Sequence, residues 1–266
     1  MQMTRKFASR PLHRHAGAAF TLMETVIAIG VLAVLLTGFI AVFTPAAQGI
    51  RRSISSQQAD RLTTTLEREL VTLRTGQTPS ATTTPSATTG FEKGFTWLRE
   101  GNAATNPKAI FVYQYRGDPA SIRPTDGTMA PMASISGQPG KEYIVQSMAR
   151  RSDDGLLLDD LTALEGPIFF VKPTQLVFQT TAGETKMVLG TPGVIKNPVP
   201  LPVRTPTPYP TDPTIAADYA DAVIPFSAEF HSVPTKSYTY LTGNDFKSRF
   251  ATVKNPVFTR NLAIRR

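Results

Sequence analysis

The chain has 266 residues, a formal net charge of +8 and no cysteine. The lack of cysteine excludes disulfides, zinc–thiolate sites, iron–sulfur clusters and a cysteine nucleophile from this sequence. Four basic residues, Arg5, Lys6, Arg10 and Arg14, lie within residues 1–19, so the remainder holds 24 of the 28 basic residues against 20 acidic ones. An excess of +4 is a weak argument for nucleic-acid binding, and we do not favour such a partner.

An apolar run follows this basic segment. No charged side chain occurs from Thr25 to Ile50. About 20 apolar helical residues cross the hydrocarbon core of a bilayer, so residues 20–44 are predicted to form a transmembrane helix. A cleaved secretory signal and a plain signal anchor are alternatives, but neither accounts for Glu24, a carboxylate at the edge of the span.

The stretch GAAFTLMETVIAIGVLAVLL, residues 17–36, resembles the prepilin signal of type IV pilins and type II secretion pseudopilins. In that family a peptidase on the cytoplasmic face cuts before a Phe, the new amine is methylated, and the fifth residue after the cut is Glu. The resemblance implies a leader over residues 1–19, cleavage between Ala19 and Phe20, N-methylation of Phe20, and an assembly role for Glu24. Ala19 stands where the family usually has Gly.

The resemblance also implies a function. The chain is expected to be a minor pseudopilin, not an enzyme, that enters a periplasmic pseudopilus of a type II secretion or type IV pilus-like system. The implied partners are a prepilin peptidase, other pilin-like subunits, an inner-membrane assembly platform and membrane lipid. The expected location is the inner membrane, with one span, a cytoplasmic N-terminus by the positive-inside rule, and the head in the periplasm or at the cell surface. A minor pilin, a DNA-uptake pseudopilin, and an anchored extracytoplasmic enzyme or binding domain remain alternatives.

The next segment, residues 45–76, is predicted to be an amphipathic helical stem. Its apolar residues recur at helical spacing, with polar residues between them: Ile50, Ile54, Leu62, Leu66, Leu70 and Leu73. Pro45 lies at its start, where a proline removes a backbone donor and crowds the preceding turn, so we expect a kink or local melting there.

Residues 77–90 contain the unit PSATT twice and are predicted to be an exposed linker. Residues 91–266 are predicted to form a β-rich head with a proline-rich loop at 192–213, which gives an α+β fold with an antiparallel sheet. The expected strands are 109–115, 141–148, 167–171, 175–180, 185–189, 222–230 and 236–241, and a short helix is expected at 159–165.

Candidate chemistry in the head is sparse. Asp153, Asp154, Asp159 and Asp160 are oxygen ligands of the kind that binds Ca²⁺, but the EF-hand spacing is absent and acidic turns are commonly just solvated. We therefore expect no cofactor, with calcium at these four residues as the alternative. His231 lies alone in a strand-like run, where histidine is more often structural than catalytic.

Overall fold

The computed structural model describes residues 21–74, 89–134, 137–181, 183–198 and 209–266. The chain divides into two compact units, residues 1–51 and 52–266. Helix α1, Leu22–Val71, contributes residues to both units. The remaining elements belong to the second unit, which we call the head: α2 Gly90–Gly101, β1 Ile110–Ile122, β2 Met129–Pro131, β3 Ile144–Arg151, α3 Leu157–Leu161, β4 Leu164–Thr181, β5 Glu184–Leu189, η2 Ala216–Asp218, β6 Val223–Ser232, α4 Tyr238–Thr242, α5 Asn244–Thr252 and β7 Phe258–Arg265.

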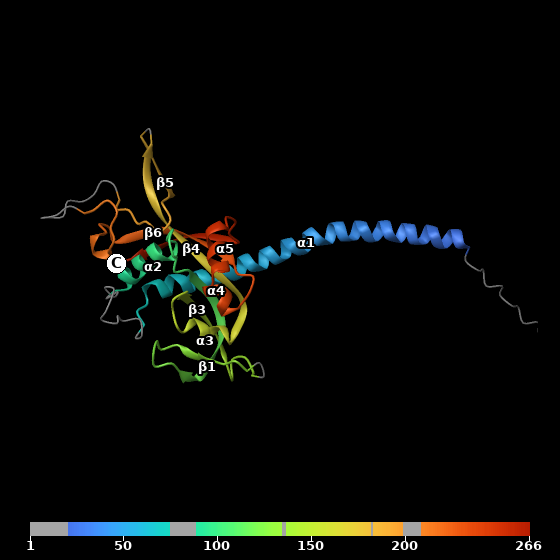
Figure 1. Ribbon diagram of the computed structural model, residues 1–266, viewed down its shortest axis with the longest axis horizontal. Helices are drawn as coiled ribbons and strands as arrows, with labels where there is room; N and C mark the ends of the chain where they lie inside the picture. Colours follow the sequence, from blue (N-terminus) through green and yellow to red (C-terminus); the bar gives the residue numbers. More distant parts are fainter. Residues whose placement is uncertain (1–20, 75–88, 135–136, 182, 199–208) are drawn as a thin grey trace, which may run out of the picture. The chain divides into compact units, whose positions relative to one another are not determined.

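The head is built on a sheet in which every pairing is antiparallel. The path runs β2-β1-β4-β6-β7, with β3 paired to β1 and β5 paired to β4. The predicted α+β layout, a long N-terminal apolar helix followed by an antiparallel sheet, is therefore confirmed (Figure 1).

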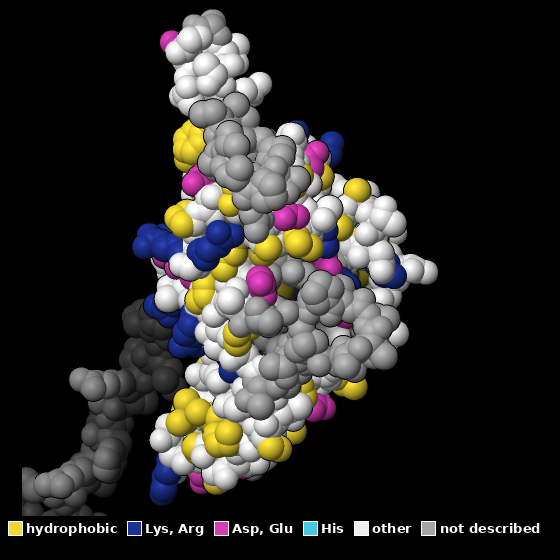
Figure 2. All heavy atoms as spheres, turned by 90° about the vertical axis from the view of Figure 1, so that its left-hand side faces the viewer, with side chains coloured by type: hydrophobic (Ala, Val, Ile, Leu, Met, Phe, Trp, Pro, Cys, Tyr) yellow, Lys and Arg dark blue, Asp and Glu magenta, His cyan; other side chains and the backbone are white. Residues whose placement is uncertain are grey.

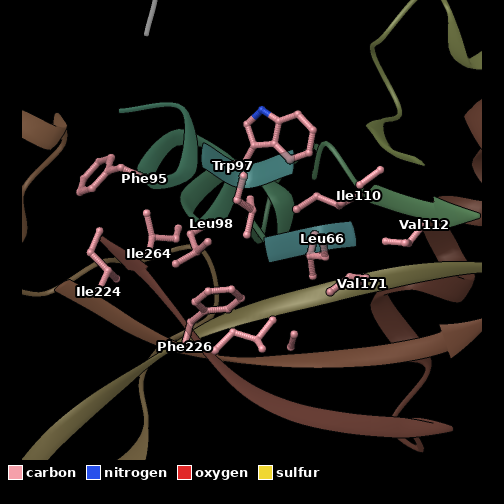
Figure 3. Packing of buried hydrophobic residues seen from close by; sticks show 14 of the residues in the cluster. Leu66, Phe95, Trp97, Leu98, Ile110, Val112, Val171, Ile224, Phe226 and Ile264 are labelled. Atoms are coloured by element: carbon pink, nitrogen blue, oxygen red, sulfur yellow. The ribbon is translucent and has the colours of Figure 1, made fainter. Parts of the chain in front are cut away.

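Side chains alternate between the two faces of the sheet and build two cores. On the first face, residues 59–70 of α1 and helix α2 cover Ile110 and Val112 of β1, together with residues of β4, β6 and β7. Figure 3 shows Leu66 and Leu98 between α2 and the strands that carry Ile110, Val171 and Phe226. On the second face, α4 and α5 cover Phe111, Tyr113 and Phe170. The sheet is thus a middle layer, with α1 and α2 on one face and α4 and α5, joined by Leu157 of α3, on the other.

Helix α2 was not predicted from the sequence. Thr89 caps its N-terminus, where the Thr89 hydroxyl accepts a hydrogen bond from Glu92 N at 3.2 Å. Three glycines, Gly90, Gly94 and Gly101, lie on one face of this helix. A Cβ at Gly94 would lie 2.7 Å from Ile264 Cδ1, and one at Gly90 only 2.2 Å from the Val71 carbonyl oxygen. These glycines let α2 approach the sheet and the end of α1 more closely than any other residue would.

Several predicted boundaries need correction. The stretch 236–241 is not a strand, because residues from Tyr238 form helix α4, whose Leu241 packs under Phe246. The expected strands 167–171 and 175–180 are parts of one strand, β4. The short helix lies at Leu157–Leu161, slightly before its predicted place. The other four strands are confirmed by β1, β3, β5 and β6.

The predicted linker, 77–90, lies outside the described residues except at Thr89 and Gly90, where α2 begins. Part of the proline-rich loop, 199–208, also lies outside them. The two flanks of that loop are held together by Asn197. Its side-chain amide donates to Pro210 O at 2.6 Å and to Asp218 O at 2.9 Å, and its Oδ1 accepts from Ala220 N at 2.7 Å.

The last residues of the chain are fixed to the head. Strand β7 pairs along its length with β6, from Val223↔Arg265 to Phe230↔Phe258. Beyond β7, the guanidinium of Arg266 donates to Ala216 O at 3.0 Å and to Tyr219 O at 3.1 Å. It also lies 4.7 Å from the centre of the Phe91 ring. This residue therefore links β7 to helices η2 and α2.

Candidate functional site: the N-terminal helix

The first turn of α1 is closed by a reciprocal pair of hydrogen bonds between Thr21 and Glu24. Thr21 N and Thr21 Oγ1 each donate to Glu24 Oε2 at 2.9 Å, and Glu24 N donates back to Thr21 Oγ1 at 3.2 Å. This is the arrangement of a capping box, which satisfies backbone donors that have no partner inside the helix. Glu24 thus has a local role that the sequence analysis missed, although the pattern Thr-x-x-Glu was legible.

The segment that follows is apolar and lies open in the structure. Large side chains from Leu22 to Phe43 are more than half exposed. Among the described residues α1 is the one helix long and apolar enough to cross a membrane, and its most apolar stretch has no part buried within the chain. An exposed apolar surface of this size is typical of a segment that contacts a membrane or another protein.

The polar side chains within this apolar segment are satisfied by the helix itself. Thr37 Oγ1 donates to Ala33 O at 2.8 Å, and Thr44 Oγ1 donates to Ile40 O at 2.9 Å. Helices can cross hydrocarbon because their backbone groups bond internally, and these two hydroxyls follow the same rule. The helix therefore presents no unbonded hydroxyl to lipid at these positions.

Helix α1 continues through Pro45 to Val71. The local melting that we expected at Pro45 is therefore absent, while a kink there stays a prediction. Ala19 and Phe20, the predicted cleavage and methylation residues, lie outside the described residues. Of the stem residues, Leu62, Leu66 and Leu70 are buried against the sheet, as their spacing predicts, whereas Ile54 and Leu73 remain about half exposed.

The end of α1 is attached to α2 by a buried ionic cluster. Glu69 accepts from Lys93 Nζ at 2.9 Å and from Arg74 Nε at 2.9 Å, and Lys93 Nζ also donates to Thr72 O at 2.6 Å. The side chains of Glu69 and Lys93 are only 3% and 4% exposed. Burial lowers the pKa of Lys93, and the Glu69 carboxylate opposes that change. The sequence did not indicate this cluster, because Lys93 lies 24 residues beyond Glu69.

The aspartates considered for calcium are engaged by arginines. Arg150 is buried, and it contacts Asp160 at 2.6 Å, Asp126 at 2.7 Å and Asp154 at 3.0 Å. Burial alone would lower the pKa of Arg150, but the surrounding carboxylates raise it above its usual value. Tyr113 donates to Asp160 Oδ2 at 2.6 Å. The carboxylates thus neutralise an internal cation.

The other two candidates do not join them. Asp153 pairs with Arg151 and lies 3.4 Å from Lys108 Nζ. Asp159 belongs to α3, where its backbone oxygen accepts from the Thr162 hydroxyl at 2.7 Å. Within the described ranges no group of three or more His, Asp or Glu side chains is placed to hold a metal ion. The structure therefore brings Asp154 and Asp160 together around Arg150 and leaves Asp153 and Asp159 apart.

His231 lies in the second core, stacked on Phe170 with ring centres 5.0 Å apart. Its Nε2 is 3.5 Å from Glu229 Oε2, and neither ring nitrogen has a hydrogen-bond partner among the described residues. Burial and the nearby charge of Lys172 lower the pKa of His231, while Glu229 opposes the change. This environment suits a neutral, structural histidine.

Comparisons with known proteins returned no matching family model, no similar curated protein and no similar solved structure.

Proposed function

We propose that the chain is a membrane-anchored, pilin-like minor pseudopilin. It would be processed before Phe20 by a prepilin peptidase and then assembled with other pilin-like subunits through an inner-membrane platform. The observation that carries the proposal is that the two halves of α1 have different surroundings. Its apolar first half is exposed, while Leu62, Leu66 and Leu70 in its second half are buried on the sheet of the head. One helix thereby offers an apolar surface for lipid or neighbouring helices and also contributes side chains to the core of the head.

The motif at residues 20–24 supports the same proposal. Cleavage would create an α-amino group at Phe20, four residues before Glu24. In an assembly of staggered helices, the amine of one subunit would approach Glu24 of another, and this pairing would offset the desolvation of each charge. The length of the chain favours a minor subunit over a major one, which must be economical.

The capping box provides a sharp test of the charge. Glu24→Gln keeps a residue that can cap the first turn but removes the carboxylate charge. Thr21→Ala removes the capping hydroxyl and keeps the charge. If Glu24 pairs with a neighbouring amine, Glu24→Gln inserts and is cut but loses crosslinks to pilin-like partners, whereas Thr21→Ala retains most of them.

The measurement is crosslinking of processed protein in membranes, together with N-terminal sequencing of the membrane form. Glu24→Val should behave as Glu24→Gln does, and Glu24→Asp should be intermediate because its side chain is shorter. Equal crosslinking by Glu24→Gln and wild type would leave capping as the role of Glu24. An uncut chain in cells with an active peptidase would refute the processing step.

A further inference from the structure

Strand β3 is paired on one side only. It runs antiparallel to β1 along its whole length, and none of the described residues pairs with its other side. The second half of the strand is closed, because Met148, Ala149 and Arg150 are buried. The first half lies open, with Ile144 and Val145 41% and 42% exposed. The head therefore has a free strand edge at the start of β3.

The register identifies the free backbone groups on this edge. Ser152 N, one residue beyond β3, donates to Ala109 O at 2.8 Å in the register that relates β3 to β1. Along an antiparallel ladder, pairs that exchange hydrogen bonds alternate with pairs that do not. Counted back from Ser152, Val145 and Ser147 fall in the second kind of pair. Their backbone N–H and C=O groups therefore point away from β1, and a further strand could bond to them.

The open part of β3 lacks the protection that other strand edges of the head have. Free edges invite pairing with other chains, and proteins commonly blunt them with charged side chains. Strand β5, in the ribbon that projects at the top of Figure 2, carries Glu184 and Lys186, and the outer strand β7 carries Arg260 and Arg265. Residues 144–147 include neither a charged side chain nor a proline. This edge is thus left able to accept a strand.

A groove of about 410 Å³ lies along the open edge. It is lined by Ile144–Ser147 of β3, by Thr64, Thr65 and Arg68 of α1, and by Met129 of β2. All of these residues belong to the head, which begins at residue 52. The volume is in the range of known ligand sites, and the free backbone groups on one side select an extended chain as the ligand.

Arg68 gives the groove a positive charge. It is the one ionisable side chain among the lining residues, and it forms no ion pair within the described part of the chain. A carboxylate is the best complement to a guanidinium, because the two groups form paired, charge-assisted hydrogen bonds. None of the residues outside the described ranges is Asp or Glu, so those segments do not supply the carboxylate. The groove therefore fits an acidic strand from another molecule.

We propose that the open edge of β3 binds an extended acidic peptide segment of a different protein. The segment adds a strand to the sheet, and its backbone bonds to Val145 and Ser147. An Asp or Glu of the segment pairs with Arg68, and an apolar side chain packs beside Ile144. Backbone pairing supplies much of the affinity, while the carboxylate selects the sequence. The inference concerns the head alone and requires neither cleavage nor filament assembly.

The first test selects ligands without assuming their sequence. The probe is a phage-displayed library of random nine-residue peptides, applied to the full-length chain in detergent. We expect the selected peptides to share Asp or Glu at one position, between β-branched or aromatic residues. Their binding, measured by fluorescence anisotropy, should weaken about tenfold or more in Arg68→Glu. Lys186→Glu makes the same change of charge on β5 and should leave binding unchanged. Failure to select any peptide, peptides without a shared acidic position, or equal binding by Arg68→Glu and wild type would overturn the proposal.

Hydrogen exchange distinguishes strand addition from other modes of binding. A selected peptide should protect the amides of Val145 and Ser147, whereas those of Ile144 and Gln146, which face β1, should change little. Ser147→Pro removes one free donor at a position where an edge strand tolerates proline, so it should weaken binding without shifting the emission maximum of Trp97. A bound peptide that leaves exchange at Val145 and Ser147 unchanged would refute strand addition. Protection that appears without peptide and rises with protein concentration would show a second copy of the chain on this edge, and would refute a partner of another kind.

Discussion

Replacing Glu69 with Gln should destabilise the head far more than a surface substitution on the same helix. The Lys93 ammonium would be left almost fully buried without a counter-charge, with only neutral acceptors: Thr72 O at 2.6 Å and the amide oxygen of the new side chain. Removing one partner of a buried ion pair costs about 3–5 kcal/mol, because the other charge stays desolvated. The matched control is Asp60→Asn, since the Asp60–Arg260 pair is about half exposed and such pairs contribute about 1 kcal/mol or less.

The assay is equilibrium unfolding of the full-length chain in detergent, followed by the emission maximum of Trp97. This is the one tryptophan in the sequence, and it is buried in the first core. The double variant Glu69→Gln, Lys93→Met should recover more than half of the loss, because the uncompensated charge is gone. A loss below about 1 kcal/mol in Glu69→Gln would refute the reasoning.

The pH dependence of Glu69→Gln provides a second criterion. Burial already lowers the folded-state pKa of Lys93 below the usual 10.5, and loss of Glu69 removes the group that opposes this change. The unfolded chain then binds more protons than the folded chain, so stability rises with pH. The deficit relative to wild type should be smaller at pH 10 than at pH 7. A deficit that does not vary with pH would mean that the ammonium is solvated.

Further predictions concern the two cores and use the same unfolding assay. Leu66→Ala should lower the free energy of unfolding by about 2–5 kcal/mol because Leu66 is buried. Leu36→Ala, in the exposed part of α1, should leave the unfolding of the head unchanged. Arg150→Met should lower the free energy of unfolding by at least about 3 kcal/mol, since it leaves the buried Asp160 with only Arg123 and Tyr113 and removes the ion pair of Asp126. Adding Asp160→Asn to Arg150→Met should not restore stability, because Asp126 still lacks its arginine. Because the folded-state pKa of His231 is lowered, its contribution to stability is complete above the usual value of 6.5 and lost as pH falls below it. His231→Phe should flatten that part of the stability profile, and an unchanged profile would contradict the buried, neutral state.

The sequence predicted best where local pattern and final packing agree. The apolar segment of α1 and the spacing of Leu62, Leu66 and Leu70 required no knowledge of the sheet. Strand β1 followed in the same way, because AIFVYQY combines β-branched and aromatic residues whose alternate side chains enter the two cores.

Helix α2 shows why the rest was harder. Phe91, Phe95 and Leu98 have helical spacing, but three glycines lower the helix propensity of the segment. Those glycines are favoured by close packing against Val71 and Ile264, which only the folded head reveals. The prediction for residues 236–241 was wrong for a related reason. The aromatic residues of this stretch favour a strand, whereas in the folded head they form α4, which packs with α5 in the second core. The ionic clusters around Glu69 and Arg150 depend on residues that the fold brings together, so no local sequence pattern predicts them.

The position of β7 sets the order in which the head can be completed after synthesis. Residues 258–265 form the last strand of the sheet and pair with β6, including Phe226 and Phe230. Arg266 then links η2 to α2. Until these residues are in place, β6 has an open edge and the first core lacks Leu262 and Ile264. The head therefore closes late in synthesis, because most of residues 52–266 must be made before the first core can be completed.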